Sequence, residues 1–204
     1  MPFSVHQHLL HQNSSAVRFV DTPNKGGNIK PTYLIMHYTA GTTADGAISW
    51  FRDPQAQASA HLVVDRDGTV TQMAAFNRKA WHAGRSRWAD IVGLNGHSVG
   101  IEIVNAGKLQ RNEKGQWINW SGKVIPPEQV TVATHKDESS PAGWHIYTPE
   151  QLEVVTEIGT ALHEKYKFID VLGHDDISPK RKVDPGPAFP MISIRSRIMG
   201  RDEA

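Results

Sequence analysis

The chain has 204 residues, of which 39% are hydrophobic and 21% charged, as expected for one globular domain with a substantial core. Its 22 lysines and arginines nearly balance 21 aspartates and glutamates, so the net charge of +1 gives no electrostatic reason to expect a nucleic-acid or membrane-surface partner. Since cysteine is absent, disulfides, thiolate zinc sites and cysteine nucleophiles are excluded.

The N-terminal segment has no feature of a targeting sequence. No apolar run approaches the roughly 20 residues of a membrane span, and MPFSVHQHLLHQNSS lacks the basic start and long apolar core of a signal peptide. We therefore expect a protein that is cytoplasmic as synthesised. Residues 1–30 are interpreted as an N-terminal extension ahead of one domain over 31–204. We expect His6, His8 and His11 to lie in an exposed polar tail, with adventitious metal binding as the alternative.

The first regular elements follow this extension. YLIMHYT (33–39) is apolar and rich in β-formers, which predicts a buried strand. A helix should follow, with Ile48, Trp50 and Phe51 on its apolar side, and Pro54 limits it.

The middle of the chain is predicted to be β-structure. Residues 60–73 form a hairpin, because two apolar runs flank Asp67-Gly68, a strong turn signal. Residues 98–107 form a strand whose odd-numbered residues 99, 101 and 103 are all apolar. Glu102 lies mid-strand on the opposite face, where its neighbours give no solvated pattern to explain a carboxylate.

The C-terminal half begins with an irregular stretch. Residues 108–147 are interpreted as a loop-rich insertion and not as a second domain. Residues 148–167 are predicted to form a helix, because Thr148 and Gln151 match a capping box and an apolar stripe follows. A short strand (168–174), a proline-rich loop (175–189) and a last helix (190–199) complete the chain.

This order of elements predicts the fold class. Strands alternate with helices and with one hairpin, which indicates an α/β protein of a single domain with a mixed central β-sheet flanked by helices.

Three side chains fall where they can converge on a metal ion. His37 ends the first buried strand, His174 ends a later strand, and Asp184 lies on the loop that follows. Strand ends and the adjacent loops commonly build an open site on an α/β sheet. A catalytic zinc needs three protein ligands and one position for water, and two histidines with one carboxylate meet that need. A lone histidine at a strand end is more often structural, so the spacing leaves both interpretations open.

Two further residues would make such a metal catalytic. Glu102 can take a proton from water and pass it to a leaving amine. Lys182 lies two residues before Asp184, so in an extended backbone both side chains point the same way. Its ammonium group could stabilise the oxyanion that forms when water attacks an amide.

Two other motifs suggest different chemistry, but the surrounding sequence does not support them. GHSVG (96–100) fits the G-x-S-x-G nucleophile elbow of serine hydrolases, but that motif needs a strand before the serine and a helix after it. Here a Gly/Asn loop precedes Ser98 and a strand follows. HEKYK (163–167) lacks the second histidine of a zincin helix. We interpret His97, His135 and His145 as structural.

Five stretches of the sequence resemble the N-acetylmuramoyl-L-alanine amidase 2 family, which shares its fold with T7-type phage lysozyme and the peptidoglycan recognition proteins. They follow the family's order and cover most of residues 30–195. The matching stretches are LIMHYTAG (34–41), SAHLVVDRDGTVTQM (59–73), AWHAG (80–84), HSVGIEIVN (97–105) and GHDDISPKRKVDPGPAF (173–189).

The resemblance implies a bacterial cell-wall hydrolase. The expected reaction is zinc-dependent hydrolysis of the amide between the lactyl group of N-acetylmuramic acid and L-alanine, in peptidoglycan or its fragments. The resemblance implies one Zn²⁺ per chain on His37, His174 and Asp184, although some relatives have Cys at the last position. It implies Glu102 as general base and Lys182 as transition-state stabiliser.

The same resemblance implies that His61, Trp81 and His82 line the substrate groove. Nothing is carried over to residues 108–147, which depart from the family's compact pattern. The tryptophans there, Trp117, Trp120 and Trp144, could stack on sugar rings or pack in a core.

The main alternative is a non-catalytic peptidoglycan-binding module of the same fold, although such relatives usually lack part of the zinc set. Three cellular roles stay open: recycling of wall fragments, a phage lysin, and an effector exported without an N-terminal signal. The sequence determines neither the oligomeric state nor a preference between intact wall and 1,6-anhydro fragments.

Overall fold

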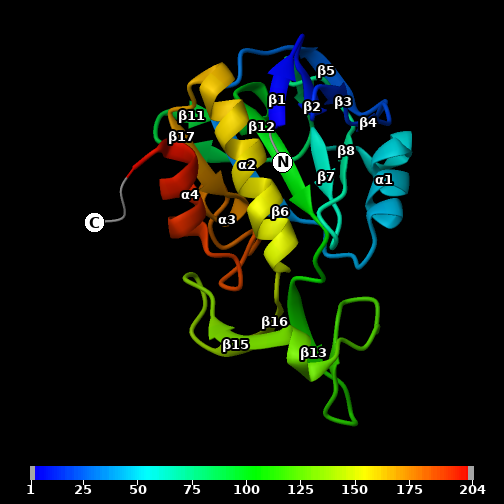
Figure 1. The fold of residues 1–204 in the computed structure, drawn as a ribbon. Helices are drawn as coiled ribbons and strands as arrows, with labels where there is room; N and C mark the ends of the chain where they lie inside the picture. Colours follow the sequence, from blue (N-terminus) through cyan, green and yellow to red (C-terminus); the bar gives the residue numbers. More distant parts are fainter. Residues whose placement is uncertain (1–2, 202–204) are drawn as a thin grey trace.

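A six-stranded mixed sheet organises the chain, as seen in a computed structural model that describes residues 3–201 (Figure 1). β17, β6, β12 and β7 are parallel, and β8 returns antiparallel to β7. The predicted α/β class with a mixed sheet is therefore confirmed. The strands lie in the order β17 (Asp170–Gly173), β6 (Tyr33–Tyr38), β12 (Ser98–Ile103), β7 (Leu62–Val64), β8 (Val70–Gln72) and β4 (Arg18–Phe19).

One face of this sheet is covered by two helices, α2 (Pro149–Tyr166) and α4 (Met191–Met199), which cross it side by side (Figure 1). Val99, Ile101 and Ile103 of β12 are fully buried in the core beneath them. The alternation predicted for this strand is confirmed, and Glu102 lies on the opposite face.

The helix α2 begins with the predicted capping box. Thr148 accepts a hydrogen bond from the backbone N–H of Gln151, and the Gln151 side chain accepts one from the N–H of Thr148. Its apolar stripe is buried in the main core at Val155, Ile158 and Leu162. Local sequence and tertiary packing therefore agree over this helix.

The other face of the sheet carries α1 (Ala44–Arg52) and the one-turn helix α3 (His174–Ile177). Ile48 and Phe51 of α1 are buried as predicted, but Trp50 is 57% exposed, so its placement on the apolar side was wrong. A residue two positions after Ile48 is turned by roughly 200° around the helix and therefore faces away from the sheet. The helix ends at Arg52, before Pro54.

The first residues of the described chain form β-structure. Leu10 is fully buried in the main core, and its N–H donates to the side chain of Gln72. The expectation of a polar tail was wrong, because the segment forms a short hairpin whose apolar residues lie inward. His6 is exposed as expected, whereas His8 and His11 are half-buried. The strands are β1 (Phe3–His6), β2 (Leu9–Gln12), β3 (Ser15–Ala16), β4 and β5 (Lys25–Asn28). The boundary between residues 30 and 31 stays a prediction.

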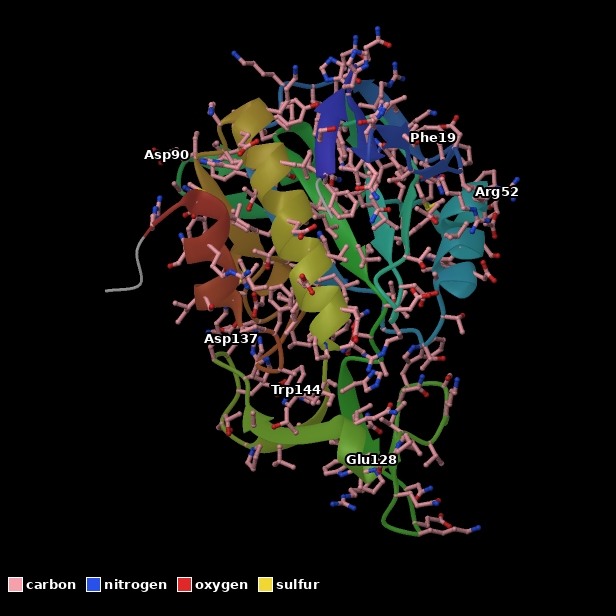
Figure 2. The ribbon with its side chains drawn as sticks, viewed as in Figure 1. Phe19, Arg52, Asp90, Glu128, Asp137 and Trp144 are labelled. Carbon is pink, nitrogen blue, oxygen red and sulfur yellow. The ribbon has the colours of Figure 1, made fainter. Side chains whose placement is uncertain are left out.

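The segment 108–147 is more regular than a loop-rich insertion. It forms an antiparallel sheet beyond the carboxyl end of β12 (Figure 1). Figure 2 shows Trp144 at the junction between this sheet and the body, while Glu128 lies on the far side. The strands are β13 (Lys108–Arg111), β14 (Trp117–Ile118), β15 (Val130–Thr134) and β16 (Pro141–His145).

Short elements complete the fold. β5 pairs with β9, and β10 pairs with β11. Within residues 3–201, no helix has the length and apolar character needed to cross a bilayer. The remaining bounds are β9 (Arg78–Ala80), β10 (Arg87–Trp88), β11 (Ile91–Val92), and the 3₁₀ turns η1 (Pro54–Ala56), η2 (Leu94–Gly96) and η3 (Pro127–Gln129).

The N-terminal hairpin should contribute to the stability of the whole domain. We expect Leu10→Ala to lower the free energy of unfolding by about 2–5 kcal/mol, because it leaves a cavity in the main core. Leu9→Ala is the matched control, since Leu9 is only half-buried. Denaturant unfolding of both variants measures the difference. Equal, small effects would mean that residues 1–30 are a dispensable extension.

Candidate metal centre and active site

The three predicted metal ligands meet on the sheet face that α2 and α4 leave free. His37 lies near the end of β6, His174 begins α3 directly after the neighbouring strand β17, and Asp184 lies on the following loop. His37 Nδ1 lies 3.0 Å from His174 Nδ1 and 3.0 Å from Asp184 Oδ2, and His174 Nδ1 lies 2.9 Å from the same oxygen. All three residues are buried. The structure therefore brings the predicted set together.

The hydrogen bonds behind His37 decide which of its nitrogens is free. Ser98 donates its hydroxyl proton to the carbonyl of Leu94, so it accepts from His82 Nε2, 3.3 Å away. His82 Nδ1 is then unprotonated and accepts from His37 Nε2 at 2.9 Å. His37 Nδ1 therefore keeps its lone pair toward Asp184, as a metal ligand requires.

His174 is oriented in the same way. Its Nε2 lies 3.1 Å from the carbonyl oxygen of Ala83, which can only accept, so Nε2 carries the proton and Nδ1 is bare. Two bare nitrogens and a carboxylate oxygen then face one another with no proton between them. A cation would relieve this repulsion, and two imidazole nitrogens with one carboxylate oxygen are a donor set that suits zinc.

Burial keeps His37 neutral. Burial first, and then the neighbouring His174, lower the pKa of His37 to about 4. At neutral pH this imidazole is therefore unprotonated and available to a metal ion.

Glu102 lies beside the metal ligands through the pairing of the strands. β12 and β6 are parallel, with Glu102 opposite His37, so both side chains share a row on one face. Glu102 Oε2 is buried and finds no hydrogen-bond partner within residues 3–201. Burial, and then the negative charge of Asp184, raise the pKa of Glu102 well above its ordinary value, while Lys182 lowers it. A carboxylate oxygen that is buried without a partner is costly, which favours a chemical role for this half-buried side chain.

A cavity of about 740 Å³ gives access to this set. Its lining includes Glu102, His174, Lys182 and Asp184, together with the predicted groove residues Trp81 and His82. Glu102 and Lys182 therefore face the same space as His174 and Asp184, whereas His37 lies behind the cavity lining.

His61 is placed differently from the other predicted groove residues. It is fully buried, its Nδ1 accepts from the N–H of Gly100, and its Nε2 donates to the carbonyl of Arg78. Burial lowers its pKa to about 4. In this position the ring presents no surface to a ligand in the cavity, and it ties β12 to β9.

Two positioning residues were not identified from the sequence. Ser98 begins β12 after η2, without the strand-turn-helix context of a nucleophile elbow, and it anchors His82. Gly100 allows this, because a Cβ there would lie 2.5 Å from Nδ1 of His82. A glycine inside a strand is the available sequence signal for such a close approach.

The 108–147 segment holds the loop that carries Asp184. His135 Nε2 lies 2.9 Å from the Asp175 carboxylate, and the Asp175 N–H donates to the carbonyl of Asp184. Tyr147 donates its hydroxyl proton to the carbonyl of Pro185. His135, interpreted as structural from the sequence, therefore supports the metal ligand from a distance.

Comparison with known proteins identifies the family. Residues 27–187 match the family model described as N-acetylmuramoyl-L-alanine amidase. Over 184 residues, 81% of each chain, the sequence is 28% identical to the 1,6-anhydro-N-acetylmuramyl-L-alanine amidase AmpD of Escherichia coli (strain K12).

Solved structures show the same fold. A selenomethionine derivative of AmpD matches with a TM-score of 0.67 and 23% identity, covering 95% of this chain and 98% of that one. The amidase AmiD from E. coli, in complex with the substrate anhydro-N-acetylmuramic acid-L-Ala-D-gamma-Glu-L-Lys, matches with a TM-score of 0.61 and 24% identity. That match covers 96% of this chain and 65% of AmiD.

Gly100→Ala should disturb the metal centre without touching a ligand. The added methyl group would displace His82 and with it the hydrogen bond that orients His37. We expect metal affinity to fall by about 10–100-fold, as for other partners of metal-bound histidines. Gly27→Ala is the control, because nothing lies within 4 Å of its Cβ position. Competition with a chelator measures the affinity, and unchanged affinity in Gly100→Ala would contradict the proposed support of His37.

Proposed function

The chain belongs to the N-acetylmuramoyl-L-alanine amidase family, and from this premise we propose that it hydrolyses the amide between the lactyl group of N-acetylmuramic acid and L-alanine in peptidoglycan fragments. One zinc ion would be held by His37, His174 and Asp184. The observation that carries this proposal is the convergence of two imidazole nitrogens and a carboxylate oxygen within 3.0 Å of one another.

Relatives support the choice of substrate. AmpD of E. coli is a 1,6-anhydro-N-acetylmuramyl-L-alanine amidase, and AmiD was solved with an anhydro-muropeptide. By analogy we propose soluble muropeptides that include 1,6-anhydro sugars as substrates of this chain.

When bound, zinc would act as a Lewis acid, which lowers the pKa of water so that it can attack at neutral pH and polarises the scissile carbonyl. Glu102 takes the proton of the attacking water on its carboxylate and delivers it to the leaving nitrogen of L-alanine. The burial that raises the pKa of Glu102 suits it to accept that proton. The Lys182 ammonium group stabilises the negative charge that develops on the carbonyl oxygen.

A binding module that does not cut would use the groove but not the Glu102 carboxylate. The buried, unpartnered Oε2 of Glu102 then costs stability without a compensating role. This observation favours the hydrolase over the non-catalytic module.

Removing one ligand should abolish metal binding and activity together. We expect Asp184→Ala to lose bound zinc and all measurable release of stem peptide, because two histidines alone hold zinc weakly. Metal analysis and cleavage of a purified muropeptide measure both properties. Glu128→Ala, which changes an exposed residue outside the cavity lining, should change neither. Full activity of a zinc-free Asp184→Ala variant would exclude the metal mechanism.

Replacing Glu102 should separate zinc binding from activity. We expect Glu102→Ala to keep stoichiometric zinc and to lose about 100-fold or more of kcat, the usual contribution of a general base. The same metal analysis and cleavage assay apply. A fully active Glu102→Ala enzyme would show that another group carries the proton.

A further inference from the structure

The structure distinguishes the three tryptophans of the 108–147 segment. Trp144 is 1% exposed and packs at the junction with the body, and Trp117 is half-buried beneath the guanidinium group of Arg111. Trp120 is 77% exposed. The first two are explained by packing, whereas packing does not account for the position of Trp120.

Trp120 is held rigidly despite its exposure. It follows Asn119 in a tight turn, where the N–H of Gly122 donates to the carbonyl of Asn119 and the Asn119 side chain accepts three further hydrogen bonds. The indole Nε1 donates to the carbonyl of Ala40 at 2.8 Å, and Lys123 Nζ donates to the hydroxyl of Thr42 at 2.9 Å. These contacts fix the tip of the segment against the loop that follows β6.

This tip forms part of the wall of the active-site cavity. Trp120 and the exposed Trp50 of α1 both line the cavity that contains Glu102, His174 and Asp184. We call Trp50 and Trp120 the aromatic rim. The wall formed by the loop before Asp184 carries Arg181 and Lys182 instead. One part of the cavity is therefore flat and apolar with polar edges, and another part is cationic.

Given the proposed function, the substrate also has an anionic part and a part that suits aromatic rings. On one side of the scissile amide lies a peptide with free carboxylates, which suit cations. On the other side lies a sugar, whose C–H face stacks on aromatic rings while its hydroxyls stay hydrated. A rigid indole loses little conformational freedom when it stacks, so it is suited to such binding.

We propose that Trp120 is a saccharide-binding residue, on which a pyranose ring of the substrate's glycan stacks, with Trp50 extending the same aromatic rim. The 108–147 segment thereby makes the chain select substrates that keep their sugar over peptides that carry only the lactyl group. This inference rests on the proposed amidase function for the position of the scissile bond.

The test compares two substrates that share the scissile amide. One is an N-acetylmuramoyl-peptide, and the other is the matching D-lactoyl-peptide without the sugar. We expect Trp120→Ala to lower kcat/KM for the sugar-bearing substrate by roughly tenfold, mainly through KM, since one stacking contact contributes on that order. Cleavage of the D-lactoyl-peptide should stay unchanged.

Two further variants control the measurement. Trp120→Phe keeps an aromatic face without the Nε1 donor and should retain most of the preference for the sugar. Val132→Ala changes another exposed apolar residue of the same segment, outside the cavity, and should behave like the unmodified enzyme. Zinc content and thermal unfolding confirm that each variant is folded.

Equal losses on both substrates would mean that Trp120 only shapes the cavity, and no loss on either would mean that it does not touch the substrate. Either result overturns the inference. Calorimetric binding of the same two compounds tests the role of Trp120 independently of the proposed amidase function. If the zinc-loaded protein cleaves neither compound, the amidase proposal fails. In that case the role of Trp120 is still supported if Trp120→Ala weakens binding of only the sugar-bearing compound. Any other binding result contradicts it.

Discussion

β6 pairs in parallel with β12 on one side and with β17 on the other, and this pairing determines where the residues of the candidate metal centre lie. The register sets Glu102 opposite His37 and brings the end of β17, followed by His174, to the neighbouring row. Because side chains alternate along a strand, the same pairing sends Leu34, Met36 and the apolar residues of β12 into the core on the other face. A slip of one residue would exchange core and site. The hydrophobic core thus determines where the metal ligands point.

Directed hydrogen bonds then determine how the buried histidines of the candidate metal centre are oriented. Each buried imidazole nitrogen needs a partner, or its desolvation is not compensated. The chain from His37 through His82 and Ser98 to a backbone carbonyl satisfies all of these atoms except the nitrogen that faces the metal position. Gly100 makes the chain possible by leaving room for the imidazole of His82. The residues behind the ligands are therefore as specific as the ligands.

The 108–147 segment contacts both the loop that carries Asp184 and the wall of the cavity. On one side, His135 and Tyr147 hold the loop that carries Asp184. On the other, the turn with Trp120 is bound to the loop after β6. The tethering residues lie just beyond strands of one antiparallel sheet: Trp120 follows β14, His135 follows β15 and Tyr147 follows β16. A specificity surface and a support for the metal ligand can then belong to one compact insertion.

The sequence by itself determined the elements whose signals are local. The alternation in β12, the capping box of α2 and the Asp67-Gly68 turn involve residues close in the chain, so their patterns predict structure directly. The family resemblance supported the three predicted ligands through motifs in a fixed order.

Only the tertiary structure decided what each side chain faces. The burial of Leu10 in the N-terminal hairpin and the burial of His61 depend on partners tens of residues away. The same holds for the tryptophans of the insertion, which are identical as residues and differ only in what packs against them. Burial and hydrogen bonding are properties of the surroundings, and in this fold the surroundings come from segments that are distant in the chain.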